Sequence, residues 1–173
     1  MYKRILVVVD DHSIAKSAVY QAVEIARING AELLLFFVLP SVHTPIGNFF
    51  ARVGVADFGL QLRTMASASR SLLEASAIAD AAGVRSQRAM GAGKDCAEYV
   101  AEVASKRQCD LIVVEAESKN ALLRLIGGSI VPGLITKARV PVLVCKEYAP
   151  KSKRRVRSYP RNHEQPEAMP VMH

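Results

Sequence analysis

The chain has 173 residues, 50% of them hydrophobic, and a formal net charge of +7. This is enough for one domain with a sizeable core, and we expect no membrane span because no apolar run approaches about 20 residues. Asp10 and Asp11 interrupt the N-terminal apolar run, which argues against a secretory signal. Cys96, Cys109 and Cys145 lack metal-ligand spacing, so we expect buried thiols in a cytoplasmic protein.

The first half of the chain alternates strand-like and helix-like patterns. Apolar, β-branched runs predict strands at Arg4–Val9, Leu33–Leu39 and Val84–Met90, the last polar enough for a sheet edge. Helical spacing predicts helices at Ser13–Asn29 and Gly59–Ala82. The expected buried stripe of the second helix is Leu62, Ala66, Leu72, Leu73, Ala75 and Ile78.

The second half continues the alternation. Asp95 is expected to cap a helix that begins at Cys96. Strands are predicted at Asp110–Val114 and Pro141–Cys145, with a helix at Ile130–Lys137 between them. The sequence therefore predicts an α/β fold, a single doubly wound five-stranded parallel sheet with helices on both faces.

A glycine loop precedes the last helix. Gly127 and Gly128 lead into Ser129, whose hydroxyl is placed to cap the helix that begins at Ile130. Free backbone amides at such a helix start point toward negative charge. The loop therefore predicts either an anion site or only a turn with a cap.

Together these segments resemble the universal stress protein domain, of the adenine-nucleotide α-hydrolase-like superfamily. The resemblance covers residues 1–146 and is most specific near the end of that range. It rests on Asp10 and Val38 ending the first two strands, the turn Gly91-Ala92-Gly93, the strand DLIVVEA, and GGSI followed by ARVPVLVCK. It implies strand order 3-2-1-4-5 and a homodimer through the last strand, Val140–Lys146, whose edge backbone groups a second copy would satisfy.

Family members that bind ATP carry Gly-x2-Gly-x9-Gly-(Ser/Thr) after the fourth strand. Gly128-Ser129 matches the end of this motif, but Glu115 and Ser118 stand at its first two glycines. A Cβ there obstructs close approach of backbone to phosphate. A carboxylate about 4 Å from a phosphate charge is opposed by about 4 kcal/mol at an effective dielectric near 20. The sequence predicts a degenerate nucleotide crevice, unless Glu115 turns away.

The resemblance also implies roles for other residues if ATP binds. Gly128, Ser129 and the Ile130 amide would hold phosphates, with Mg²⁺ present only together with nucleotide. Asp10 would meet the ribose or phosphate side, Val38 would offer backbone groups to adenine, and Gly91 would border the site. Alternatively, Asp10 only complements the dipole of the first helix. Asp10, Glu115 and Glu117 lack regular spacing, so no metal site is predicted.

No catalytic motif is present. Ser129 has no histidine at a recognisable spacing, and the sequence has neither a P-loop nor a dinucleotide fingerprint. We therefore expect a binding protein and not an enzyme, although slow ATP hydrolysis stays compatible with the ATP-binding alternative.

Two segments lie outside the expected α/β core. Ser41–Asp57 is a long loop that forms a lid or a partner surface, or folds Phe49 and Phe50 back onto the core. Glu147–His173 has six Lys or Arg against three Glu, and its composition predicts disorder. It serves either as a solubilising extension or as a weak contact for nucleic acid or an anionic surface.

The sequence thus predicts a cytoplasmic, dimeric stress-response module that binds or signals. One alternative is a true ATP-binding universal stress protein that acts as a nucleotide-dependent switch. The other is a scaffold that uses the 41–57 loop and the basic tail.

Overall fold

The computed structural model of the chain describes residues 1–10, 17–39, 58–116 and 130–146. One parallel sheet has five strands in the order β3-β2-β1-β4-β5, which confirms the predicted fold. The strands are β1 (Arg4–Val9), β2 (Glu32–Leu39), β3 (Ser86–Ala92), β4 (Leu111–Glu115) and β5 (Val142–Cys145). The helices are α1 (Ser17–Asn29), α3 (Phe58–Ala81), α4 (Cys96–Lys106) and α6 (Ile130–Lys137).

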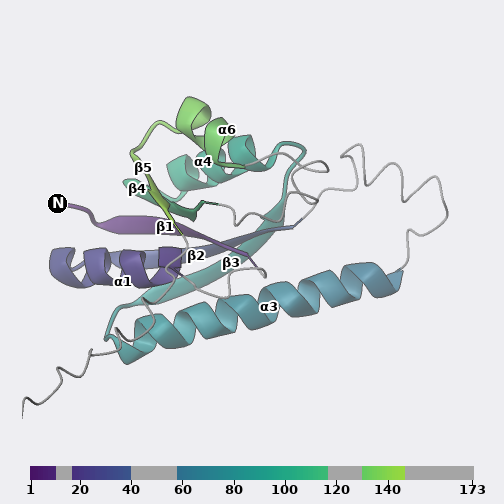
Figure 1. Cartoon of the computed structure of the whole chain (residues 1–173), viewed down its shortest axis with the longest axis horizontal. Helices are drawn as coiled ribbons and strands as arrows, with labels where there is room; N and C mark the ends of the chain where they lie inside the picture. The colour runs from purple at the N-terminus through teal and green to yellow at the C-terminus, as the bar shows by residue number, and fades with distance from the viewer. Residues whose placement is uncertain (11–16, 40–57, 117–129, 147–173) are drawn as a thin grey trace, which may run out of the picture.

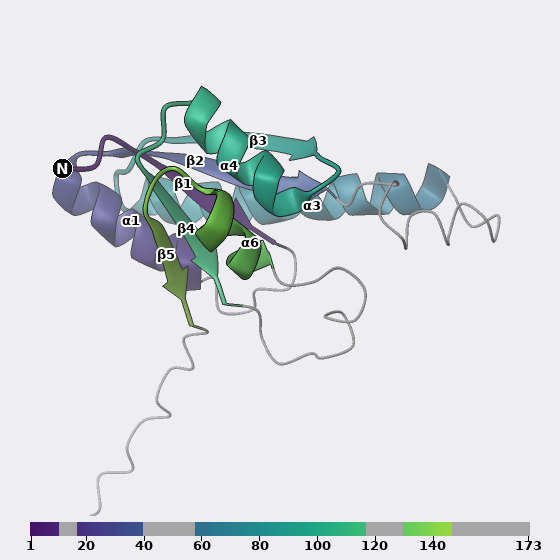
Figure 2. The same cartoon turned by 90° about the horizontal axis from the view of Figure 1, so that it is seen from above.

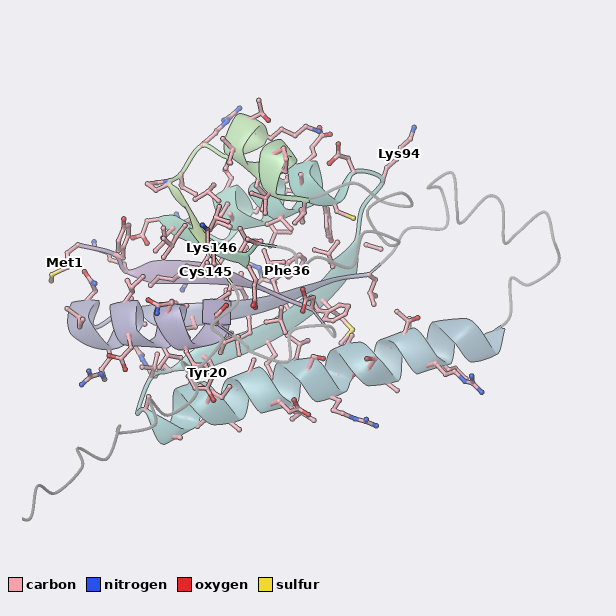
Figure 3. All side chains as sticks on the ribbon, viewed as in Figure 1. Met1, Tyr20, Phe36, Lys94, Cys145 and Lys146 are labelled. Carbon is pink, nitrogen blue, oxygen red and sulfur yellow. The ribbon has the colours of Figure 1, made fainter. Side chains whose placement is uncertain are left out.

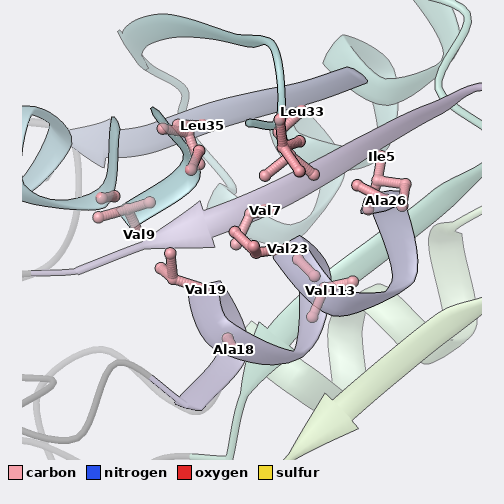
Figure 4. Close-up of a cluster of buried hydrophobic side chains, with 14 of the residues drawn as sticks. Ile5, Val7, Val9, Ala18, Val19, Val23, Ala26, Leu33, Leu35 and Val113 are labelled. Atoms are coloured by element: carbon pink, nitrogen blue, oxygen red, sulfur yellow. The ribbon is translucent and has the colours of Figure 1, made fainter. Parts of the chain in front are cut away.

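Helices cover both faces of the sheet. Figure 1 shows α1 and α3 on one face and α4 and α6 on the other, and Figure 2 gives the view from above. Successive side chains of a strand point to opposite faces, so Val7 joins the core under α1 and α3 while Leu6 joins the core under α4 and α6. Figure 4 shows part of the first cluster. Burial on both faces explains why β1 is apolar throughout.

The buried side of α3 differs from the predicted stripe. Leu62 and Leu73 are 51% and 55% exposed, and Ala66 is exposed too. Among residues 62–81 of α3, for which burial is described, the fully buried ones are Ala68, Leu72, Ala75 and Ala79, and of these Leu72 and Ala75 were predicted. Because β2 presents large leucine and phenylalanine side chains to this face, small alanines on α3 let helix and sheet approach closely.

Strand β3 runs further than predicted. It begins at Ser86 and continues through Gly91 to Ala92, with Gly91 paired to Val38 of β2. The turn expected at 91–93 was therefore wrong for its first two residues, since glycine in the ladder makes room for a side chain from α4, as described below. The predicted edge position of β3 is confirmed.

The second edge of the sheet is β5, also as predicted. Val142, Leu143 and Val144 are partly exposed, whereas Cys145 is buried. Within the described parts of the chain, no helix has the length and apolarity needed to cross a membrane.

Candidate functional site

The candidate site lies at the carboxyl ends of β1 and β4. The chain leaves β1 toward α1 on one face and leaves β4 toward α6 on the other, so the direction of the crossovers reverses between these neighbours. In such sheets, ligands bind at this reversal. Asp10 is exposed directly after β1, and Glu115 is the last residue of β4.

Glu115 belongs to the sheet and not to the loop that the ATP motif implied. It is partly buried and is paired with Cys145 of β5. The next residue, Ala116, donates its N–H to the Cys145 carbonyl at 2.6 Å. The hydrogen-bonded ladder between β4 and β5 thus extends to Ala116, past the position of the motif's first glycine. The Ala116 N–H is therefore already used in a hydrogen bond to β5.

Strand alternation fixes the face to which Glu115 points. Val7 lies level with Val113, so Val9 is level with Glu115, and Val9 belongs to the core under α1. Cys145, the partner of Glu115, belongs to the same core. Burial raises the pKa of the Cys145 thiol, and the negative charge of Glu115 raises it further. Figure 3 marks Cys145 at the end of β5. The Glu115 carboxylate therefore points to the α1 face, away from α6.

The opposite side of the candidate site is apolar. Val38 at the end of β2 and Ile130 at the start of α6 are partly buried and pack against the same core, under α4 and α6. Phe36 of β2 contacts Tyr99 of α4, with ring centroids 5.9 Å apart. The structure therefore brings these two predicted site residues to one apolar cluster that also contains an aromatic pair.

Gly91 has a structural reason to be glycine. A Cβ at this position would lie 2.5 Å from the Tyr99 hydroxyl oxygen, and one at Gly93 would lie 2.5 Å from the Tyr99 Cβ. The Tyr99 side chain thus occupies the space beside both glycines. Sequence reasoning assigned Tyr99 only to the helical stripe of α4. A tyrosine six and eight residues after two glycines, across a strand-to-helix turn, is a usable signal for such a close contact.

An ion pair holds α6 against α4. Asp95 caps α4 by accepting a hydrogen bond from the Glu98 N–H at 3.0 Å, as predicted. The Lys137 ammonium of α6 lies 2.5 Å from the other carboxylate oxygen of Asp95. The hydrogen bond from Glu98, followed by that from Lys137, lowers the pKa of Asp95. Because the two side chains are 39% and 46% exposed, the pair contributes at most about 1 kcal/mol to the contact between the end of α6 and the start of α4.

Three of the predicted site residues, Ser118, Gly128 and Ser129, lie outside the described residues. So do the 41–57 loop and the tail from residue 147, on which the scaffold alternative rests. Among the described residues there is no group of three or more His, Cys, Asp or Glu side chains that would hold a metal ion.

Known proteins share the sequence pattern and the fold of this chain. A model described as the universal stress protein family matches residues 1–146. Universal stress protein MJ0531 of Methanocaldococcus jannaschii is 27% identical over 150 residues, which cover 85% of this chain and 84% of that protein.

Two solved structures have the same fold. One is the universal stress protein of Archaeoglobus fulgidus in complex with dAMP, with TM-score 0.60 and 21% identity over 83% of this chain and 97% of that one. The other is a universal stress protein family protein of Arabidopsis thaliana with AMP bound, with TM-score 0.59 and 18% identity over 85% and 93%. Since the family match spans the whole described sheet and all of its helices, the chain belongs to the universal stress protein family.

Proposed function

We propose that this protein acts as a dimeric stress-response module that binds or signals, and that its crevice binds ATP only weakly. The observation that carries the proposal is the hydrogen bond from the Ala116 N–H to the Cys145 carbonyl. A phosphate needs free backbone N–H groups where the chain leaves the strand. Here the hydrogen-bonded ladder between β4 and β5 continues through Ala116, so its N–H is not free.

Two effects of similar size oppose a phosphate at the end of β4, and the backbone effect is the stronger once salt screens the charge. A hydrogen bond to a charged group contributes about 1.5–3 kcal/mol, which is lost if the Ala116 amide stays in the ladder. The Glu115 carboxylate points to the α1 face, and at about 8 Å its repulsion is about 2 kcal/mol before salt screening. Because screening weakens only the second effect, backbone geometry dominates at physiological salt.

A series of variants separates these effects. Glu115→Gly combined with Ser118→Gly lets the chain leave the ladder earlier, so calorimetric titration with ATP and Mg²⁺ should give binding at least tenfold tighter than for the wild type. Glu115→Gln removes only the charge and should gain less than the double variant. If Glu115→Gln alone gave the full gain, charge and not backbone geometry would govern the crevice.

A second candidate is a true ATP-binding switch with at most slow hydrolysis. It is favoured by the direction of Glu115, whose side chain leaves the α6 side of the crevice open, and by the adenine nucleotides bound to the two family structures above. In this case Asp10 meets the ribose side, and Val38 and Ile130 contribute backbone groups to adenine and phosphate. Adenine nucleotide retained through purification and released on denaturation would favour this candidate.

The dimer in our proposal forms through β5. The carbonyls of Pro141 and Cys145 accept hydrogen bonds from β4, so the backbone groups of Val142 and Val144 point to the open edge in a parallel ladder. A second copy related by two-fold symmetry would satisfy them. The free thiols of Cys96, Cys109 and Cys145 fit a reducing compartment, and we assign the protein to the cytoplasm.

A further inference from the structure

One flank of α3 carries exposed apolar side chains. Leu62, Met65 and Leu73 are 51%, 49% and 55% exposed. With Ser69 and Ser76 they recur at intervals of three or four residues, so they lie along one side of the helix. Large apolar side chains in such a row are unusual on a surface unless they meet a partner.

The direction of this flank follows from contacts with β3. The Ser76 hydroxyl lies 3.5 Å from the Ser86 hydroxyl, at the start of β3. The flank therefore faces the outer edge of the sheet and not α1. Met90 of β3 is paired with Phe37, whose side chain lies in the core under α3, so Met90 points to the same side and is 40% exposed.

The arrangement of α3 and β3 leaves this flank uncovered by the described elements. Figures 1 and 2 show α3 extending beyond the carboxyl end of β3, so the first turns of the helix have no strand beneath them. Leu62 and Met65 belong to these N-terminal turns. Together with Leu73 and Met90 they form what we call the α3–β3 surface.

Positive charge borders the α3–β3 surface. Arg63 and Arg70 are exposed on the outward side of α3, which adjoins the apolar flank, and Arg70 is one turn before Leu73. Arg88 of β3 is exposed on the same side as Met90. The first turn of α3 has no acidic residue, so the positive end of the helix dipole adds to this field. The acidic residues of α3, Glu74 and Asp80, lie toward its C-terminal end.

We infer that the α3–β3 surface docks an amphipathic segment of a partner protein, with apolar side chains on one side and Asp or Glu beside them. Its apolar residues contact Leu62, Met65, Leu73 and Met90, and its carboxylates meet Arg63, Arg70 and Arg88. Apolar contact supplies most of the affinity, and the charges set orientation and on-rate. This surface lies apart from the crevice at β1 and β4, so the inference does not depend on nucleotide binding.

A membrane fits these observations less well. Helices that lie on bilayers insert a broad apolar face by about 5–10 Å. Here the four apolar side chains are only 40–55% exposed, and the sequence has no tryptophan. The side chains of a partner protein therefore fit the α3–β3 surface better than a bilayer does.

Selection from a displayed library of random 16-residue peptides, with the full chain as bait, tests the inference. Enriched peptides should combine apolar residues at intervals of three or four with neighbouring Asp or Glu. Fluorescence anisotropy should show at least tenfold weaker binding to Leu62→Ser/Leu73→Ser and to Arg63→Glu/Arg70→Glu. The matched controls Ile28→Ser/Ile135→Ser and Arg107→Glu/Arg139→Glu alter exposed isoleucines and arginines elsewhere and should bind as the wild type does.

Several results would overturn the inference. They are the absence of an acidic enrichment, equal binding by the surface variants and their controls, and binding of phosphatidylserine vesicles that Leu62→Ser/Leu73→Ser abolishes. Sedimentation in which the same variant turns a dimer into a monomer would assign the surface to a second copy. Weaker amide-exchange protection of α3 in Phe49→Ser/Phe50→Ser would assign it to the chain's own 41–57 segment.

Discussion

Replacing Gly133 with alanine tests the contact that positions α6. Gly133 lies within α6, and a Cβ built on it would be 2.6 Å from the Cβ of Ala97 on α4. Carbon atoms pack best at about 3.5–4.0 Å, so one of the two helices must shift by about 1 Å. The substitution therefore disturbs the α4–α6 contact that orients Ile130.

Two opposite effects determine the stability of Gly133→Ala. In an open helix, alanine is favoured over glycine by about 1 kcal/mol. Overpacking a close contact costs about 1–3 kcal/mol, and here it involves two Cβ atoms that no rotamer change can move. We expect the free energy of unfolding to fall by about 1 kcal/mol, measured by urea denaturation followed by circular dichroism.

A second substitution makes the test specific to this contact. Ala97→Gly removes the opposing methyl group, so the double variant Gly133→Ala/Ala97→Gly should show a favourable coupling of about 1 kcal/mol or more in a double-mutant cycle. A rise in stability for Gly133→Ala alone would refute the close approach of α4 and α6. Strict additivity of the two substitutions would refute it as well.

Three further predictions concern the edge, a helix cap and a thiol. In Val144→Pro, the proline removes a backbone N–H that points outward from β5 and makes no hydrogen bond to β4. Light scattering should therefore find a folded monomer, and a persistent dimer would contradict pairing through β5. Asp95→Ala should lower the free energy of unfolding by about 1 kcal/mol at pH 7. Because the folded pKa of Asp95 is lowered from 3.8, this difference should shrink as pH falls below that value; a constant difference would exclude the charged cap. Burial raises the pKa of Cys109 to about 11, so iodoacetamide at pH 8 should label it at least tenfold more slowly in the native protein than in urea, by mass spectrometry; equal rates would contradict its burial.

Much of the fold follows from local sequence patterns. The apolar run of β1 requires cover on both faces, and the alternation of such runs with amphipathic helices leads to a parallel sheet. The glycines that follow the predicted helices and the Asp95 cap placed several helix boundaries within a residue or two of those in the structure. The strand order came from the family resemblance, because the residues alone do not specify which strands are neighbours.

The errors arose where tertiary contacts override local preference. Leu62 and Leu73 are more apolar than the alanines of α3, yet the alanines are buried because β2 already fills the interface with large side chains. Glycine has a low strand preference, yet Gly91 continues β3, where the Tyr99 side chain fills the space that a Cβ would occupy. Hydrophobicity and propensity describe one residue at a time, so neither contains this information.

The candidate site was predicted in part. The positions of Asp10, Val38 and Ile130 at the carboxyl side of the sheet followed from the strand and helix boundaries. The apolar run predicted a strand that stops at Val114, whereas the strand DLIVVEA of the family resemblance already includes Glu115, as β4 does. The hydrogen bond from Ala116 to Cys145 could not be predicted, because it joins residues far apart in sequence. In our proposal, that bond makes the course of the backbone, and not a charge, the main obstacle to phosphate.

Calorimetric titration of the wild-type protein with ATP and Mg²⁺ tests the central claim most directly. With the Ala116 amide held in the sheet and Glu115 at the end of β4, we predict a dissociation constant weaker than about 1 mM, which corresponds to a binding free energy of less than about 4 kcal/mol. A micromolar constant would contradict the account and make the nucleotide-dependent switch the function of this protein.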